Sequence, residues 1–363
     1  MMSLIIGLGV VLVLAILYLI FRIGNLVELV KGKKDDVSSW NTANAYLLML
    51  FMIVSLVSFV WYSVVHFDSY NLPVASEHGA LTDYLFWITM AVTVVAFVII
   101  TIAMFWFTFK YRYQEGRKAS FVSDDHRLEI IWTVIPAIVL ALLIFSGLRA
   151  WNDITGPASK DAVVIELIGQ QFLWTARYPG VKDSQLGKHN YKMIDASNEF
   201  GLDLSDKNTF DDFKSLELHL PKGKEVQLMI RAKDVLHSVF LPHFRVKMDA
   251  VPGMHTTFKF IPTKSTADMR EETGNPNFNY EMACTEICGR GHFSMRFPVF
   301  VHDTVEDYEK WMASQEAWLK QNPEYLQRVP PALREAAMIK AGIPADSEAA
   351  IMASPVTVTA KFK

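Results

Sequence analysis

Cysteine is scarce in this chain, which has two cysteines among 363 residues. Two cysteines cannot build a disulfide framework or a four-cysteine zinc site, and the chain has no Cys-x-x-Cys-His motif for haem attachment. Basic residues are not in surplus either, because 35 Lys and Arg face 38 Asp and Glu. A nucleic-acid-binding protein would show a basic surplus, so no nucleic acid is expected as a partner.

Long apolar runs are abundant, and 51% of the residues are hydrophobic. Four runs are long enough to cross a lipid bilayer at about 1.5 Å per helical residue. We predict spans at residues 4–23, 45–65, 85–109 and 128–150. A secretory signal peptide is the alternative for the first run, but no positive charge precedes it and no small-residue cleavage site follows it. We therefore expect an uncleaved helix.

Basic residues follow the first and third runs and suggest an orientation in the membrane. They are Arg22 at the end of the first run with Lys31, Lys33 and Lys34 after it, and Lys110, Arg112, Arg117 and Lys118 after the third. Because positively charged links stay in the cytoplasm, the connector at residues 66–84 should lie outside. Four crossings then place the chain after Trp151 on the periplasmic side of a bacterial-type inner (plasma) membrane.

The periodicity changes after Asp161 to short alternating runs separated by turn residues. We predict strands at residues 162–168, 172–178, 215–220, 225–230, 255–261 and 296–301. Many short strands with few helices favour an all-β Greek-key sandwich or barrel. The polar stretch 179–213 is too long for an ordinary hairpin loop, so it should either cover a partner or be mobile.

These patterns divide the chain into four parts. We expect two membrane helices with connectors at 1–79, a transmembrane hairpin at 80–151, the β domain at 152–302 and a C-terminal helix and arm at 303–363. The helix is expected at 303–321, where aromatic residues and methionine form an apolar face. The remaining tail should be an arm over neighbouring subunits.

Both cysteines lie in one short stretch that also contains a histidine and a methionine. Cys284, Cys288, His292 and Met295 form a soft donor set, which suits copper better than magnesium or calcium. A pair of cysteines outside the cytoplasm more often forms a disulfide, but the spacing of the histidine and methionine favours a metal site. Two thiolates can bridge two copper ions, and His237 could supply a second imidazole.

The run Cys-x-Glu-x-Cys-x-x-x-His-x-x-Met, with Asp-Val-Leu-His-Ser at residues 234–238, resembles the dinuclear copper site (CuA) of subunit II of haem-copper cytochrome c oxidases. The resemblance covers roughly residues 80 to 302 and implies a cupredoxin fold. It implies that Cys284 and Cys288 bridge the two coppers and that His237 and His292 each bind one. Met295 and the backbone carbonyl of Glu286 would be weak axial ligands.

The side chain of Glu286 remains available in that scheme. The resemblance makes this carboxylate a ligand of a magnesium ion shared with the catalytic subunit, and hard oxygen donors suit that ion. The alternative is a solvated loop carboxylate.

Glu129 begins a run, Glu-x-x-Trp-Thr-x-x-Pro, that resembles the membrane hairpin of the same family. The resemblance implies that Glu129 admits protons into a channel of the partner subunit. The alternative is a carboxylate placed at a helix start, where the helix dipole favours it.

The aromatic cluster of the family is altered in this chain. Where the family has Gly-His-Gln-Trp-Tyr-Trp, residues 169–174 read Gly-Gln-Gln-Phe-Leu-Trp. Phe172 therefore occupies the position that accepts electrons from cytochrome c, and Trp174 is the retained aromatic residue; both could instead be ordinary core residues. This departure leaves two donors open, a soluble cytochrome c or a membrane-bound haem c domain.

The resemblance implies the electron-accepting subunit of a proton-pumping cytochrome c oxidase. Oxygen would be reduced to water in the haem-copper catalytic subunit I. A quinol oxidase subunit would lack the two thiolates, and nitrous oxide reductase would add a large propeller. A membrane-tethered copper-delivery protein is the main alternative, and it would bind one copper through exposed sulfurs.

Overall fold

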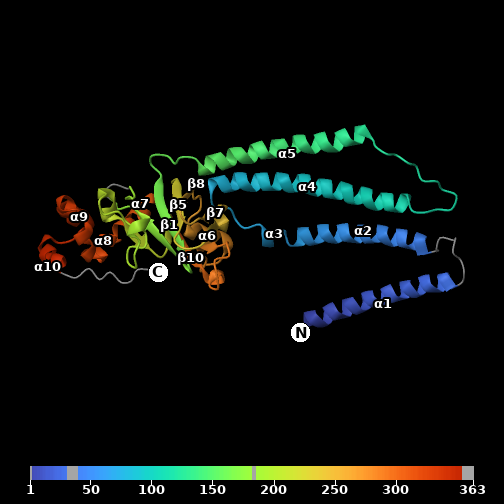
Figure 1. The fold of residues 1–363 in the computed structure, drawn as a ribbon, viewed down its shortest axis with the longest axis horizontal. Coiled ribbons are helices and arrows are strands. Elements are labelled where there is room, and N and C mark those ends of the chain that lie inside the picture. Colours follow the sequence, from blue (N-terminus) through green and yellow to red (C-terminus); the bar gives the residue numbers. More distant parts are fainter. Residues whose placement is uncertain (1, 31–39, 182–184, 354–363) are drawn as a thin grey trace. The chain divides into compact units, whose positions relative to one another are not determined.

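The structure is a computed structural model that describes residues 2–30, 40–181 and 185–353. Within these residues, four long apolar helices precede the β domain (Figure 1): α1 (Met2–Val30), α2 (Trp40–Val65), α4 (Glu77–Lys110) and α5 (His126–Thr155). Each is long and apolar enough to cross a membrane, which confirms the four predicted spans. The basic residues Lys31, Lys33 and Lys34 lie outside the described residues, so the orientation inferred from them stays a prediction.

The four helices are hydrophobic on all sides, as expected of segments that face lipid. Pro136 lies inside α5, where it removes one backbone donor without ending the helix. The chain divides into two compact units, residues 1–70 with 88–137, and residues 71–87 with 138–363. The second unit contains the β domain, and everything described below belongs to it unless stated otherwise.

Ten strands form two sheets of five strands each in the described part of the chain. One sheet has the order β3-β2-β1-β5-β8 and the other β4-β10-β9-β6-β7. The strands are β1 (Val163–Gln170), β2 (Leu173–Tyr178), β3 (Phe213–Ser215), β4 (Leu218–Pro221), β5 (Val226–Ala232), β6 (His237–Leu241), β7 (Val246–Ala250), β8 (Thr256–Phe260), β9 (Tyr280–Cys284) and β10 (Arg296–His302). The parallel pairs β1–β5 and β4–β10 join strands that are distant in sequence. This confirms the predicted all-β domain.

Alternating apolar residues of both sheets meet in one core. Leu167, Leu228, Val239 and Phe297 are among its members and are almost completely buried. The single strand predicted at 215–220 is wrong, because the chain crosses between the sheets there. β3 pairs with β2, whereas β4 pairs with β10 of the other sheet.

The remaining helices are short. They are α3 (Phe67–Tyr70), α6 (Thr266–Thr273), α7 (Val305–Ala313), α8 (Trp318–Gln321), α9 (Arg334–Ala341) and α10 (Glu348–Ala353). The helix predicted at 303–321 is therefore two helices. The chain leaves the first at Ser314, and the Trp318 N–H then donates to the carbonyl of Asp212, 2.8 Å away.

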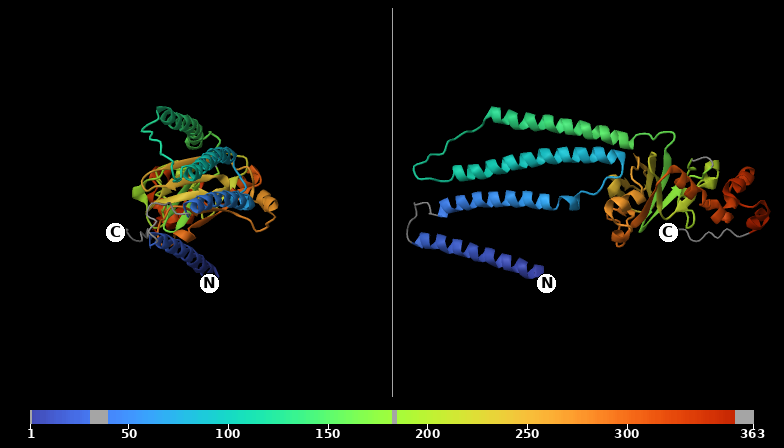
Figure 2. Two further views of the ribbon diagram at one scale, coloured as in Figure 1. Left: turned by 90° about the vertical axis from the view of Figure 1, so that its right-hand side faces the viewer. Right: turned by 180° about the vertical axis from the view of Figure 1, so that it is seen from behind.

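The C-terminal region packs on its own chain and not as an extended arm. A second core joins it to the long insert between β2 and β3. Figure 2 shows the C-terminal helices, in red, beside this insert. Its main members are Phe200, Leu202, Leu204 and Phe210 from the insert and Trp318, Leu319, Tyr325, Leu326, Ala337 and Met338 from the tail. We call residues 185–212 and 317–353 the cap. The alternative of a mobile insert is wrong for these residues, because each segment buries the apolar side chains of the other. That the insert or the tail covers neighbouring subunits stays a prediction.

A buried ionic network fastens the cap to the first sheet. Glu166 on β1 is fully buried and pairs with Arg177 on β2 and with Arg231 on β5. Arg177 also pairs with Asp212 of the cap at 3.1 Å and donates to the carbonyl of Gly187 at 2.9 Å. Buried charges persist only when they are paired, so this network specifies where the cap sits.

Candidate metal centre

His237 is the first residue of β6, and its ring is completely buried. Its Nε2 lies 2.9 Å from Oδ1 of Asp234. The other oxygen of Asp234 accepts a hydrogen bond from the Gln171 N–H at 2.7 Å, which fixes the carboxylate. Because a carboxylate at Nε2 holds the ring proton there, Nδ1 is left as the acceptor, and this atom faces Cys284 Sγ at 3.8 Å.

The loop between β9 and β10 carries the other predicted donors. Cys284 ends β9, and its N–H donates to the carbonyl of Met295 at 3.1 Å, which closes the loop. Gly289 has φ 133, a backbone conformation that other residues rarely adopt. The side-chain amide of Gln171 donates to the Cys288 carbonyl at 2.5 Å. The loop is therefore held in place at both its ends and its middle.

The donor atoms converge in two similar halves. Cys284 Sγ lies 3.8 Å from His237 Nδ1 and 3.3 Å from the carbonyl oxygen of Glu286. Cys288 Sγ lies 3.6 Å from His292 Nδ1 and 3.8 Å from Met295 Sδ. Each half thus combines one sulfur, one imidazole nitrogen and one weak neutral donor.

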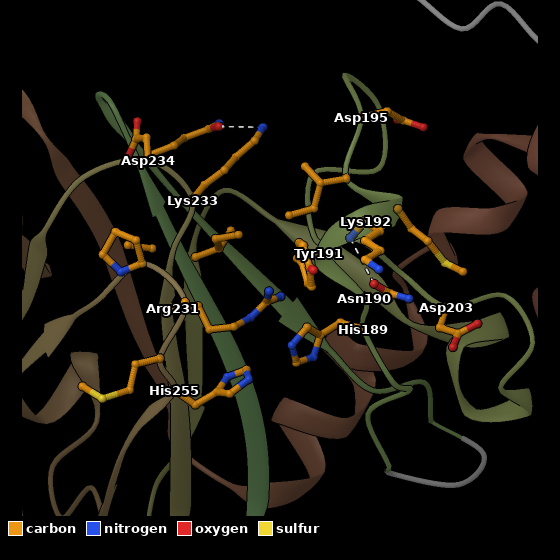
Figure 3. A pocket seen from close by; sticks show the side chains of 18 of the residues that line it. His189, Asn190, Tyr191, Lys192, Asp195, Asp203, Arg231, Lys233, Asp234 and His255 are labelled. Atoms are coloured by element: carbon orange, nitrogen blue, oxygen red, sulfur yellow. Dashed lines mark hydrogen bonds between the residues drawn. The ribbon is translucent and has the colours of Figure 1, made fainter. Parts of the chain in front are cut away.

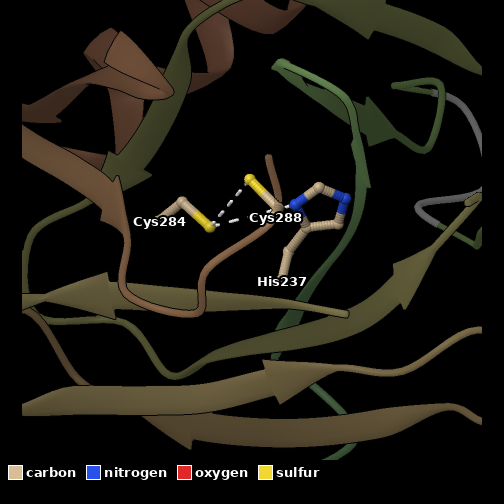
Figure 4. A group of neighbouring side chains, drawn as sticks. All are labelled: His237, Cys284 and Cys288. Atoms are coloured by element: carbon tan, nitrogen blue, oxygen red, sulfur yellow. Dashed lines mark hydrogen bonds between the residues drawn. The ribbon is translucent and has the colours of Figure 1, made fainter. Parts of the chain in front are cut away.

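The two sulfurs face each other at 4.0 Å without a covalent bond. A disulfide would need about 2.05 Å. His237, Cys284 and Cys288 together have ligand atoms within 4.8 Å of one another (Figure 4).

Without a metal, the surroundings of the sulfurs favour neutral thiols. Burial, together with the neighbouring Cys284, raises the pKa of the Cys288 thiol to about 11. Thiolates at this spacing need a positive charge between them, and a bound metal would displace the thiol protons. Thiolate, imidazole and thioether donors fit copper, and the two halves provide a donor set for two ions.

The other predicted site residues lie in different places. Trp174 is fully buried with its ring centroid 5.7 Å from that of His237, whereas Phe172 is 38% exposed. A methyl group added at Gly291 would come within 2.5 Å of the Phe172 ring, so this ring rests directly on the metal-binding loop. Glu129 lies in the first turn of α5, 3.1 Å from His126 Nδ1, in the other compact unit.

Glu286 contributes only its carbonyl oxygen to the cluster. Its side chain is half-buried, and no ion pair of this carboxylate occurs within the described residues.

Sequence reasoning missed two residues that hold the ligands, Asp234 and Gln171. Asp234 stands three residues before His237, and a carboxylate close to a ligating histidine is a common supporting arrangement. That proximity could have identified it. Gln171 reaches Cys288 across 117 positions of sequence, and no local signal reveals such a contact.

Comparison with known proteins shows which family the chain belongs to. The family profile described as "Cytochrome C oxidase subunit II, periplasmic domain" matches residues 163–304, and the one described as "Cytochrome C oxidase subunit II, transmembrane domain" matches residues 60–150. The alternative cytochrome c oxidase subunit 2 of Bradyrhizobium diazoefficiens is 34% identical over 252 residues, which cover 68% of this chain and 84% of that protein.

Further relatives include the cytochrome c oxidase subunit 2 of Thermostichus vulcanus. It is 32% identical over 302 residues, which cover 76% of this chain and 86% of that protein. The crystal structure of the periplasmic domain of subunit II of cytochrome oxidase from Bradyrhizobium japonicum is 21% identical, with a TM-score of 0.30; the match covers 44% of this chain and 96% of that chain. All the donor residues from His237 to Met295 fall inside the profile of the periplasmic domain.

Proposed function

Because the chain belongs to the cytochrome c oxidase subunit II family, we propose that its cysteine loop and His237 hold a dinuclear copper centre, CuA, that accepts electrons. The protein is a membrane-bound subunit of a haem-copper terminal oxidase, with transmembrane helices and a periplasmic cupredoxin-like domain. The two matching halves of the donor cluster are the observation that carries the copper proposal.

In this proposal Cys284, Cys288, His237 and His292 would hold the copper pair. Met295 and the Glu286 carbonyl would be weaker donors. When bound, the copper pair supplies a one-electron carrier whose change of charge is spread over two ions. Asp234 orients His237, and two rigid strand ends hold the loop, so little rearrangement accompanies electron transfer.

Electron uptake would use two aromatic residues, Phe172 in the turn between β1 and β2 and Trp174 in β2. Phe172 is exposed and rests on the metal-binding loop, and Trp174 packs against His237. The donor is a soluble cytochrome c or a membrane-bound haem c domain. The electron then passes to haem in the catalytic subunit I, which reduces oxygen to water.

Three further assignments belong to this proposal. Glu129 admits protons at the start of α5, where a carboxylate is already favoured by the helix dipole. The Glu286 carboxylate binds magnesium at the junction with the catalytic subunit. The copper domain lies on the outer side of the inner (plasma) membrane, as the positively charged links indicate.

The burial of the sulfurs argues against a copper-delivery protein. Such a protein must hand its metal to a partner through accessible sulfurs. Here Cys284 is 7% exposed and Cys288 is 4% exposed.

Electron transfer in the purified oxidase complex tests the proposal. Cys288→Ser should leave the haem content unchanged while the reduction of haem by cytochrome c falls by orders of magnitude, because a bridging thiolate is lost. Ser294→Ala changes an exposed residue of the same loop and is the matched control. Unchanged haem reduction in the Cys288→Ser complex would refute the function.

A further inference from the structure

A large cleft opens beside the metal-binding loop, with a volume of about 1510 Å³. The cap forms one wall with residues 188–195, and the turns after β1, β5 and β7 form the other (Figure 3). Gln171 and Asp234 lie at its edge. These are the residues that contact Cys288 and His237, so an occupant of the cleft would sit one residue away from the copper ligands.

Basic side chains outnumber acidic ones around this cleft. Three carboxylates line it: Asp195 accepts from Tyr325 and Arg328, Asp203 accepts from Ser205, and Asp234 accepts from Gln171 and faces His237. Lys188 and Lys192, by contrast, are exposed on the cap wall. Neither of these lysines has an ion pair among the described residues.

Lys233 strengthens the positive field on the opposite wall, where its ammonium donates to the side chain of Gln170 at 3.1 Å. Basic groups therefore stand on both sides of the opening.

Apolar side chains lie between these charges. Tyr191 is 72% exposed and Met254 is 54% exposed, and both line the cleft. An apolar centre with a charged rim is suited to a brief, oriented encounter between two proteins, in which the charges steer the approach.

We propose that this cleft is the docking site of a haem c electron donor whose docking surface is acidic. Carboxylates around the exposed haem edge would pair with Lys188 and Lys192, and the haem edge would face the turn at Gln171 and Phe172. One electron leaves the donor haem, which goes from ferrous to ferric, and reduces the copper centre by one electron; no proton moves. This inference rests on the proposed function and names the class of donor.

The test compares two soluble monohaem cytochromes c of similar potential, one with net negative and one with net positive charge. Their second-order rates of oxidation by the purified complex are measured by stopped flow over a range of ionic strength. The acidic cytochrome should react faster at low salt, and its rate should fall as salt increases, because screening removes the attraction.

Charge reversal locates the site. The double variant Lys188→Glu/Lys192→Glu should slow the acidic cytochrome by about tenfold or more at low salt and should speed the basic one. Lys160→Glu is the matched control, since this exposed lysine precedes β1 at the end remote from Gln170, more than about 20 Å along the strand. It should change the rates by less than about twofold.

The outcomes separate this inference from the function on which it rests. A faster reaction of the basic cytochrome, or an acidic preference that the double variant leaves intact, would overturn the docking site. The rates of the two cytochromes with the wild-type complex, measured over the range of ionic strength, decide the first of these outcomes without any variant. Electron paramagnetic resonance on the same samples is the second readout: a missing copper-pair signal in the wild type would refute the function itself.

Discussion

The carboxylate of Asp234 lies 2.9 Å from Nε2 of His237 and accepts the backbone N–H of Gln171 through its other oxygen. One side chain therefore connects a predicted copper ligand with the turn that leads to Phe172. The carboxylate strengthens the imidazole as a donor and so favours the oxidised metal.

Asp234→Asn should raise the midpoint potential of the copper centre and weaken copper binding by about 10- to 100-fold. A redox titration and a competition with a chelator measure the two effects. Asp249→Asn is the control, because Asp249 accepts from Ser238 and not from a ligand. An unchanged potential in Asp234→Asn would show that the contact with His237 has no influence on the metal.

Glu166 is buried in ion pairs with two arginines, so we expect a large loss of stability when its charge is removed. Glu166→Gln leaves Arg177 and Arg231 without their shared carboxylate, and breaking a buried pair costs about 3–5 kcal/mol. Denaturant unfolding of the full-length chain in detergent measures this change. Glu281→Gln removes an exposed pair with Arg296 and should cost less than about 1 kcal/mol. Equal losses in the two variants would contradict a special role for the network.

The raised pKa of Asp212 predicts how the stability of the cap depends on pH. Burial, with smaller contributions from the Asp211 and Glu166 carboxylates, raises the pKa of Asp212 from an ordinary value of 3.8 to about 7, against the opposing effects of Arg177 and the Gly187 N–H. A carboxyl group with a raised pKa holds its proton more tightly in the folded state than in the unfolded state. Its contribution to stability is therefore fully present below pH 3.8 and is lost as the pH rises through about 7.

The wild type should therefore lose stability relative to Asp212→Asn as the pH rises from about 5 to about 8. Glu166 has a lowered pKa, so its own contribution is lost only at more acidic pH, below its ordinary value of 4.5. Thermal unfolding of both proteins across this range gives the difference. Parallel curves would mean that Asp212 does not titrate there.

The cap depends on contacts between the insert and the tail. Leu326→Ala removes a fully buried side chain of the second core and should destabilise the cap by about 2–5 kcal/mol, so that limited proteolysis cuts the insert faster. Ile339→Ala changes a 66% exposed residue of α9 and should leave the cleavage rate unchanged. Equal protection in both variants would argue that the tail does not hold the insert.

The sequence allowed much of the site to be predicted, because Cys284, Cys288, His292 and Met295 lie on one loop with regular spacing. The structure brings these donors together with His237 from another strand. The strand β6 was missed because His237 and Ser238 are polar yet fully buried, which breaks the apolar alternation that reveals a strand.

The cap could not be predicted from local patterns. The insert is rich in aspartate and asparagine, and its apolar residues, such as Phe200 and Phe210, follow no helix or strand period. They become core residues only because they pack against Trp318 and Leu326, which lie more than a hundred positions later in the sequence. Such long-range packing leaves no mark on either segment alone.

Electron paramagnetic resonance with copper quantitation on the full-length chain, loaded with copper in detergent, tests the central claim most directly. The account predicts two coppers per chain that share one unpaired electron and give a seven-line hyperfine pattern. The Cys284→Ser and Cys288→Ser variants should each lose that pattern. One copper per chain with a four-line pattern, or no copper and a disulfide between Cys284 and Cys288, would contradict it.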